Sequence, residues 1–471
     1  MILILEILIT VFCVSLEWYI PGAIMLVCLS LLRLIRKFGN GSFFLELVYF
    51  FTTLTCLLMP VLGFTIFTKS NPVALLWFKY MPVDQVRYFA YLLPACTLFS
   101  LSFFAFRSGS VDDHAFTKKV WFQIRELAQI VPSGIIRSLY FISLVAYNIS
   151  YIIPDAFKQV NNFLYLTFYS SLFYIYYKVN FPKRVMYLVG GFLFILVDAL
   201  RSGMFTVIAY MSGIFLILML AGVKIRFQYR IVIVFGALAS LGYLQLFKLD
   251  WREQNWENRS GQANAIVRSL EKNRATKVES VLFPLYVRMN QGFNIGLVMR
   301  RIPYKVDHLG GDYLFTTFVS SFVPRLFWPD KPEAGGKANM RIYTGLTLKG
   351  WSTNVGPVGE AYGSFGVVYG CIYLFFFGLF IRSGYIVFLK VCRTHPTMFL
   401  WMPLLFFQLV YVMETDSLQA FNSMMKGALF MLILYRLAPG LFPKSTHESS
   451  VHRTRRAPAL PQFGKGVPAH S

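Results

Sequence analysis

Charged residues are scarce in this chain of 471 residues: Asp, Glu, Lys and Arg make up 14%, against about a quarter in soluble proteins. Hydrophobic residues make up 56% of the chain, and 18% of its residues are aromatic. This balance excludes an ordinary soluble domain. It predicts an all-α polytopic integral membrane protein, in which most apolar side chains face lipid.

Cysteine is also rare, and the chemical motifs that would mark a cofactor site are missing. The six cysteines all lie in or beside apolar runs, which excludes a disulfide framework and gives no metal-ligand spacing. The sequence has no P-loop, no His-Glu-x-x-His motif and no Asp-x-Asp in an outward loop. We therefore predict no cofactor and no metal.

Basic residues exceed acidic ones, giving a formal net charge of +23. They lie mostly in the short segments between apolar runs, which is the usual distribution on the cytoplasmic side of a membrane protein. The charge therefore indicates membrane topology, and we do not expect a nucleic-acid partner.

Twelve apolar segments are expected to cross the membrane as helices, since lipid offers the backbone no hydrogen-bond partners. Glu6 and Glu17 interrupt the first of them. The segments are 1–17, 19–35, 43–67, 86–106, 132–152, 157–177, 184–200, 203–221, 229–247, 366–386, 397–413 and 417–437.

The Lys and Arg bias places both termini in the cytoplasm and the one long polar segment, 248–365, in the periplasm. The predicted organisation is thus transmembrane helices 1–9 over 1–247, a large periplasmic loop over 248–365, and helices 10–12 over 366–437. Residues 438–471 are rich in Pro, His, Arg and Ser, which predicts a disordered cytoplasmic tail.

The long loop carries more Lys and Arg than Asp and Glu, so its surface suits a pyrophosphate or another anion. A further cation, Arg201, lies at the outer boundary between two apolar runs, three residues after Asp198. Ionisable residues so deep in apolar sequence are functional candidates. A structural ion pair that closes a tight helical hairpin is the alternative.

Arg288 lies in a stretch, 278–302, whose apolar residues recur at helical spacing. The spacing predicts an amphipathic helix lying on the membrane surface. Arg288 is then either a ligand-binding residue or a contact to a lipid headgroup.

Arg325 and Lys331 lie in a segment with three prolines, Pro324, Pro329 and Pro332. Proline at this density forbids a regular helix and stiffens the backbone. Such a segment can hold two cations in fixed positions, as an anion site requires. A stiff turn with solvated charges is the alternative.

Glu360 lies in a glycine-rich stretch just before a predicted span and can serve as a general base or orient an arginine. His308 is the only histidine predicted to face outward and is a second candidate base, or an ordinary surface histidine. Glu414 and Asp416, between the last two spans, are candidates for the opposite wall of the site.

Two stretches resemble segments of the Wzy-type polymerases of O-antigen and exopolysaccharide repeat units. The first runs from Gly310 through Pro324-Arg325 to Lys331-Pro332, and the second is Gly359-Glu360-Ala361-Tyr362-Gly363-Ser364-Phe365-Gly366. The stretch from Asp198 to Gly203 is similar to the junction between two mid-chain spans in that family. A layout of many spans with one dominant outer loop is also shared.

The resemblance implies a GT-C-like, metal-independent glycosyltransferase of the bacterial inner membrane. It would move a glycan from undecaprenyl pyrophosphate onto a new lipid-linked repeat unit, with a chain-length regulator and a flippase as possible partners. Pyrophosphate binding falls to Arg201, Arg288, Arg325 and Lys331. Glu360 or His308 would activate the acceptor hydroxyl, and Asp198 and Tyr362 would support the site.

Two alternatives stay open at this point. An O-antigen ligase, which transfers glycan to lipid A-core, has a similar architecture and depends on an outward histidine, a role that His308 can fill. A twelve-span flippase or transporter fits the span count, but such proteins usually have related halves and bind their substrates near the membrane midplane.

Overall fold

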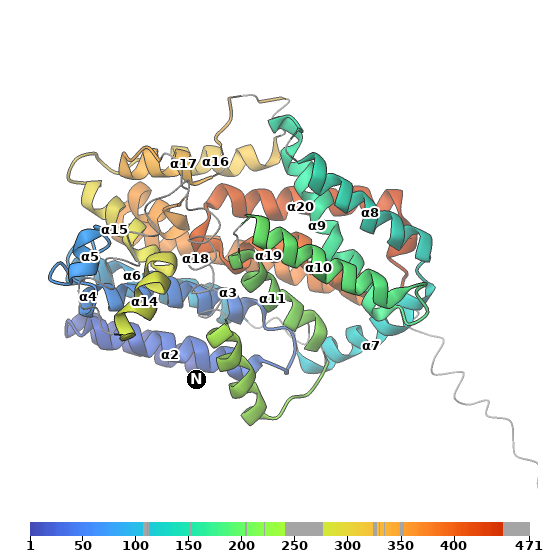
Figure 1. Ribbon diagram of the computed structural model, residues 1–471. Coiled ribbons are helices and arrows are strands. Elements are labelled where there is room, and N and C mark those ends of the chain that lie inside the picture. Colours follow the sequence, from blue (N-terminus) through green and yellow to red (C-terminus); the bar gives the residue numbers. More distant parts are fainter. Residues whose placement is uncertain are drawn as a thin grey trace, which may run out of the picture.

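The computed structural model describes residues 1–106, 111, 113–150, 152–202, 205–220, 222–240, 277–323, 327–328, 330–333, 335–348 and 353–445. These residues form helices joined by short connections, and no β-strand occurs among them (Figure 1). Of the predicted organisation, residues 248–276 of the long loop and 446–471 of the tail lie outside the described residues. The start of the predicted disordered tail is ordered instead: Pro439–Leu441 forms the short helix η6, and Leu441 and Phe442 are buried against the protein.

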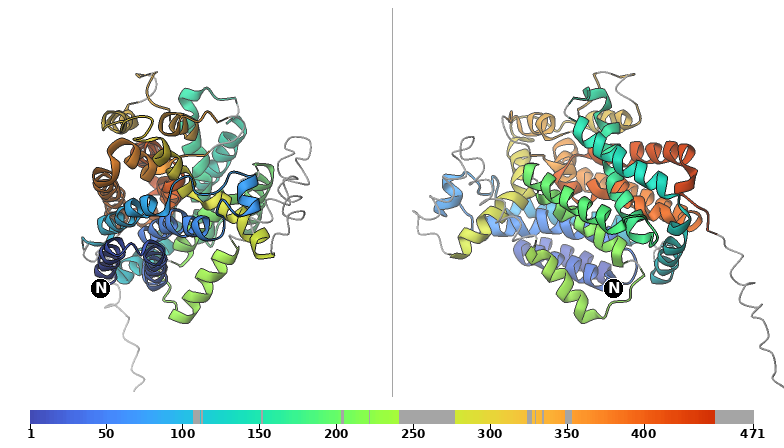
Figure 2. Two further views of the ribbon diagram at one scale, coloured as in Figure 1. Left: turned by 90° about the vertical axis from the view of Figure 1, so that its left-hand side faces the viewer. Right: turned by 45° about the vertical axis from the view of Figure 1, so that its right-hand side comes forward.

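The first part of the chain forms a layer of apolar helices. These are α1 (Ile2–Ser15), α2 (Tyr19–Lys37), the continuous run α3 (Phe44–Thr53), η1 (Leu54–Leu58) and α4 (Met59–Thr65), short α5 (Pro72–Leu76) and α6 (Gln85–Phe104). Helix α2 packs on α1, α3 and α6, and the first two helices lie side by side in Figure 2. The element η1 is a turn of π-helix, which widens the helix locally.

The middle of the chain begins with α7 (His114–Ile130) and α8 (Ser133–Ile149), which bend by 97° at their junction. Helices α9 (Asp155–Tyr177), α10 (Arg184–Ser202) and α11 (Phe205–Leu220) follow, and then the apolar helix Phe227–Ser240. Helix α9 packs against α8, α10 and α19, so it joins this group to the last helices of the chain.

The remaining helices hold the candidate site. They are α14 (Lys277–Met289), α15 (Gln291–Arg301), α16 (Asp312–Phe322), α17 (Gly336–Asn339), η3 (Met340–Thr344), α18 (Gly356–Thr394), η4 (Pro396–Trp401), α19 (Met402–Val410), η5 (Val412–Glu414), α20 (Ser417–Leu437) and η6 (Pro439–Leu441). Helix α16 lies along α20, and α18 packs closely on α6 (Figure 1). A methyl group on Gly378 of α18 would meet the Ser102 hydroxyl at 1.9 Å, so a small residue is needed at this crossing.

Helix α18 begins ten residues before the predicted tenth span and has a break where that span was expected to start. The span was expected to start at residue 366, whereas helical structure starts at Gly356 and breaks at Gly366 (φ 73°, ψ −156°). The stretch 356–365, assigned from sequence to the loop, is therefore a short helix that precedes the kink. Its glycines and buried small residues make it too weakly apolar to read as part of a span from sequence.

Five helices among the described residues are long and apolar enough to cross a membrane: α2, α3–α4 together, α6, α18 and α20. The bent pair α7–α8 makes a sixth if it is one broken span. This supports the prediction of an all-helical, multi-pass membrane protein. The other predicted segments coincide with helices, but four of these have only 10–17 residues, against about 20 for a span. Twelve spans therefore remain a prediction.

The predicted surface helix over 278–302 is wrong in two respects. The segment is two helices, α14 and α15, which meet at Asn290, whose side chain caps α15 by accepting from Phe293 N. Helix α15 is also buried against α4, η1 and α18. Gly292 and Gly296 permit this, because a methyl group on Gly292 would collide with Pro60 and Tyr88. The periodic pattern predicted a helix correctly but could not show that its polar face has protein partners.

The two acidic interruptions of the first segment have different surroundings. Glu17 is exposed at the end of α1, whereas Glu6 is fully buried and forms an ion pair with Arg33 of α2 at 3.0 Å. Ser100 of α6 donates to the same carboxylate, and the Arg33 guanidinium lies 3.9 Å from the centre of the Phe104 ring. A buried charge pair thus joins the first, second and sixth helices.

We expect Glu6→Gln to lower the stability of the purified protein by about 3 kcal/mol, since it removes the carboxylate that contacts the buried Arg33 guanidinium. The measurement is thermal unfolding in detergent. The exposed acid Glu17 supplies the matched control, and Glu17→Gln is expected to unfold like the parent. Equal unfolding of both variants and the parent would contradict a buried charge pair that holds these helices together.

Candidate functional site

The two motif segments lie side by side, where α18 breaks. The kink at Gly366 leaves backbone carbonyls of the preceding turn without their helical partners. Leu309 N donates to the carbonyl of Gly363 at 3.1 Å. Gly310 N donates to the carbonyl of Ser364 at 3.0 Å. The start of one motif segment thus completes the hydrogen bonding of the other.

His308 and Tyr362, both candidates from sequence, lie together at this kink. The imidazole of His308 is next to Gly366, where an added Cβ would lie 3.2 Å from Nε2. Its ring meets that of Tyr362 edge-on, with 5.9 Å between centroids. His308 is exposed, and Tyr362 is buried and accepts a hydrogen bond from Arg87 of α6 at 3.1 Å. The same guanidinium group donates to Ile302 O at 3.1 Å, so Arg87 joins α6, α15 and α18.

Glu360 is 1% exposed, and both of its carboxylate oxygens accept hydrogen bonds inside the protein. Asn339 of α17 donates from its amide to Oε1. Ser417 donates from its backbone to Oε2 at 3.0 Å, at the first residue of α20. The carboxylate therefore joins α17 to the start of the last long helix, α20. This arrangement favours a positioning role for Glu360 over direct contact with a substrate.

Asp416 is the second buried acid of the same network. Its side chain caps α20 by accepting from Gln419 N at 2.6 Å, and it also accepts from Gly335 N at 2.7 Å and from the Asn354 amide at 3.0 Å. Burial raises the pKa of the Asp416 carboxyl above its usual value, and these three donors partly offset the increase. Asp416, predicted to line the opposite wall of the site, thus bonds to Gly335 and Asn354 of the long polar segment.

Asparagine side chains connect the two acids. The Asn339 amide reaches Asn354 Oδ1 at 3.3 Å as well as Glu360, and the Tyr313 hydroxyl donates to Asn339 Oδ1 at 3.1 Å. Glu360, Asp416, Asn339 and Asn354 therefore form one connected buried network. No group of three His, Cys, Asp or Glu side chains in the described part of the chain has a metal-binding arrangement.

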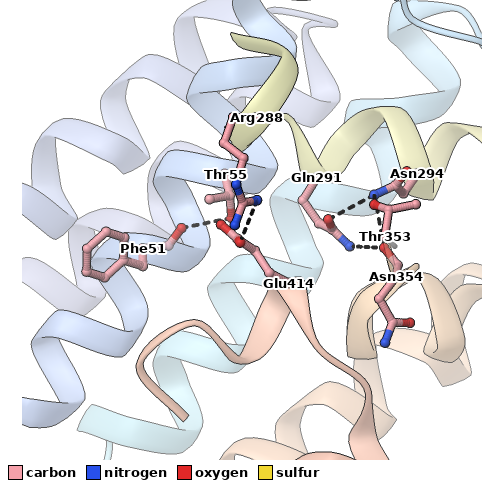
Figure 3. Close-up of polar contacts among 8 residues, drawn as sticks. All are labelled: Phe51, Thr55, Arg288, Gln291, Asn294, Thr353, Asn354 and Glu414. Carbon is pink, nitrogen blue, oxygen red and sulfur yellow. Dashed lines mark hydrogen bonds and ion pairs between the residues drawn. The ribbon is translucent and has the colours of Figure 1, made fainter. Parts of the chain in front are cut away.

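Helix α15 contributes further amides, shown in Figure 3. Asn294 donates to Thr353 Oγ1 at 2.8 Å and to Gln291 Oε1 at 3.1 Å. Gln291 donates to the carbonyl of Asn354 at 2.7 Å. The segment that enters α18 is thus held from one side by α15 and from the other by the acidic network.

Arg288 pairs with Glu414, which comes from the connection between α19 and α20 (Figure 3). The distance from Nη1 to Oε2 is 2.9 Å, and the side chains are 37% and 10% exposed. Glu414 also lines a small cavity between this connection and α3–η1. The other residues that line it are Phe51, Thr52, Thr55, Val410, Tyr411 and Met413.

The proline-rich segment is described in part. Lys331 is only 6% exposed, and its ammonium group donates to the carbonyls of Ser320 and Val323, at 3.1 and 2.6 Å. It therefore caps the carboxyl end of α16, a use that reduces its availability to an anion in this conformation. Arg325, the other predicted cation of this segment, lies outside the described residues.

Asp198 and Arg201 both belong to helix α10, three residues apart. Asp198 accepts hydrogen bonds from the hydroxyls of Tyr147 and Tyr165, at 2.6 and 3.2 Å. The predicted support role of Asp198 thus includes holding two tyrosines from α8 and α9. The side chain of Arg201 lies outside the described part of the structure.

The family described as a domain of unknown function, DUF8712, matches residues 49–428. The chain belongs to this family. No curated protein and no solved structure matches the chain. The DUF8712 region runs from α3 into α20, so it includes the kink of α18, the acidic network and the pair of Arg288 with Glu414.

Several residues of the DUF8712 region that hold the site together were missed from the sequence. They are Arg87, Gln291, Asn294, Asn339 and Asn354. Amides carry no charge and match no catalytic motif, so nothing marked them individually. The amides had one available signal, their position: Gln291 and Asn294 lie one turn apart, next to apolar residues of the same helix. Arg87 was visible from sequence only as one cation of a short segment between spans.

Proposed function

We propose that this protein is a membrane glycosyltransferase that polymerises oligosaccharide repeat units carried on undecaprenyl pyrophosphate. The reaction would take place at the outer face of a bacterial inner membrane and yield O-antigen or exopolysaccharide. Twelve membrane-crossing helices and cytoplasmic termini, as predicted from the apolar segments and the Lys and Arg bias, are part of the same proposal.

The observation that carries the proposal is the meeting of the two motif segments at the kink of α18. They are separated in sequence, yet Gly310, the first residue of one segment, donates to the carbonyl of Ser364 in the other, and the preceding Leu309 donates to that of Gly363. Segments that carry a resemblance only by chance have no reason to share one hydrogen-bonded junction. The site also offers a cation, Arg288, and an exposed imidazole, His308, on the loop.

The proposed reaction needs one bond to form and one to break. The acceptor hydroxyl oxygen attacks the anomeric carbon of the donor glycan, and the bond from that carbon to the pyrophosphate oxygen breaks. The electron pair leaves on the lipid pyrophosphate, where cations such as Arg288 and Arg325 stabilise the developing charge. The hydroxyl proton passes to a base. His308 is the exposed candidate, while Glu360 positions the loop segment that carries Asn339.

The direct test is incubation of the purified protein with lipid-linked repeat units, without ATP or an ion gradient. We expect a ladder of longer glycans on the lipid carrier. Arg325→Ala and Arg201→Ala are expected to lose the ladder at unchanged protein levels, because each removes a predicted pyrophosphate contact. Repeat units that stay single with the parent protein, or a full ladder with both variants, would contradict the proposal.

An O-antigen ligase is the second candidate, and the exposed position of His308 at the kink favours it. Adding lipid A-core to the same reaction separates the two. A ligase moves the glycan onto lipid A-core in a single transfer, whereas a polymerase continues to lengthen the glycan on undecaprenyl pyrophosphate. Transport of unchanged repeat units across a vesicle membrane would instead identify a flippase.

A further inference from the structure

The ion pair of Arg288 with Glu414 places an acid on the cation that the proposed function assigns to pyrophosphate. The Arg288 side chain is 37% exposed, so a ligand outside the protein can reach it. The carboxylate is only 10% exposed and contacts it from the protein side, at 2.9 Å. In this conformation a protein carboxylate occupies a position where an anionic ligand would bind Arg288.

The ion pair of Arg288 with Glu414 joins two separate elements beside a cavity, so a ligand that breaks it can change how these elements are connected. Arg288 is in the last turn of α14, in the outer loop, whereas Glu414 ends η5, between the last two long apolar elements. Glu414 also lines the small cavity that Thr55 of η1 lines. A π-turn such as η1 is a frequent feature of functional sites, since it interrupts regular helical packing.

We propose that Glu414 is an internal competitor for the anion site at Arg288: it holds the guanidinium until a phosphate-bearing ligand displaces it. A pyrophosphate outcompetes a carboxylate because it carries more charge and more acceptor oxygens for the planar guanidinium group. Displacement separates Glu414 from Arg288 and uncouples α14 from the α19–α20 connection. The assignment of the ligand as the substrate pyrophosphate rests on the proposed function.

The test is a double-mutant cycle on the full-length protein in detergent, with inorganic pyrophosphate as the probe. Glu414→Gln removes the competing charge at nearly constant shape, and we expect it to bind pyrophosphate roughly three- to tenfold more tightly than the parent. Arg288→Ala is expected to weaken binding about tenfold or more. The double variant should bind like Arg288→Ala alone, because Glu414 acts through Arg288.

Two results would overturn the proposal. One is unchanged pyrophosphate affinity in Glu414→Gln. The other is equal tightening by Glu414→Gln in the parent and in Arg288→Ala, which would mean a general electrostatic effect. Glu333→Gln is the matched control, because Glu333 is an exposed acid of the same loop, and it should leave affinity unchanged. If Glu414→Gln fails to fold, Glu414→Asp supplies the test, since its shorter side chain weakens the pair and should tighten binding to a smaller extent.

The source of the phosphate is tested by repeating the cycle with phosphatidylglycerol or with a zwitterionic lipid in the micelles. If Glu414→Gln binds pyrophosphate more tightly than the parent in both lipids, the ligand of Arg288 is a pyrophosphate and not a bilayer headgroup. Complete loss of the difference in phosphatidylglycerol assigns Arg288 to bilayer headgroups and overturns the substrate assignment. The polymerisation assay is independent of this cycle. If polymer forms but Glu414→Gln leaves pyrophosphate affinity unchanged, the competitor role of Glu414 is wrong and the proposed function stands. If the affinities change as expected but no polymer forms, the proposed function is wrong and the competitor role stands.

Discussion

Glu360→Ala is expected to abolish polymer formation, with activity reduced roughly a hundredfold or more. The substitution removes both acceptors that Asn339 and the backbone N–H of Ser417 use. The Ser417 N–H and the Asn339 N–H that points at Glu360 are then left buried without an acceptor, at a cost of about 1–3 kcal/mol each. The segment that carries α17 would keep its bonds from Gly335 to Asp416 and from Asn339 to Asn354 but lose its direct bond to α18. Misplacement by about an ångström is enough for a loss of this size. The measurements are the polymer ladder and thermal unfolding of the purified variant.

Conservative variants separate charge from geometry at this position. Glu360→Gln keeps the size of the side chain but has one acceptor oxygen, so it can satisfy only one of the two donors and should unfold between the parent and Glu360→Ala. Asp307→Asn is the control, because Asp307 is an exposed acid of the same loop. Full activity of Glu360→Ala at parental stability would show that the network does not position the site.

Sequence reasoning located the helices well, because hydrophobic periodicity is a local property. The run 417–437, for example, coincides with α20. It also selected Glu360 and Arg288 as candidates, since a charge in apolar or glycine-rich surroundings has few structural explanations. Local patterns do not show which distant groups meet. The partner of Arg288 is Glu414, more than a hundred residues later in the chain. One partner of Glu360 is the backbone amide of Ser417, which no side-chain pattern can indicate.

The error at 278–302 has the same physical origin. An amphipathic pattern states that one face of a helix is polar, and a membrane surface is one of several environments that satisfy such a face. Here the polar residues Gln291 and Asn294 are satisfied by the segment that enters α18. The glycines that allow this approach, Gly292 and Gly296, are visible in the sequence, but their neighbours Pro60 and Pro82 come from other elements.

Gly366→Ala is expected to remove activity while leaving the helices in place. The backbone at Gly366 has φ 73° and ψ −156°, a conformation that is almost restricted to glycine and costs another residue about 1–3 kcal/mol. The new methyl group would also lie 3.2 Å from the His308 imidazole. We expect the backbone to relax toward a continuous helix, in which Gly363 and Ser364 recover helical partners. Leu309 and Gly310 then lose their acceptors, and His308 moves away from the junction.

Hydrogen exchange tests this directly, because the amides of Leu309 and Gly310 are bonded to carbonyls that only the kink leaves available. In Gly366→Ala these two amides should exchange faster than in the parent, while helical circular dichroism stays unchanged and the polymer ladder is lost. Gly134→Ala is the matched control, since a Cβ there has no neighbour within 4 Å. Parental exchange at both amides together with a normal ladder would show that the kink is dispensable. Faster exchange with a normal ladder would show that the junction of the two motif segments does not hold the reacting groups.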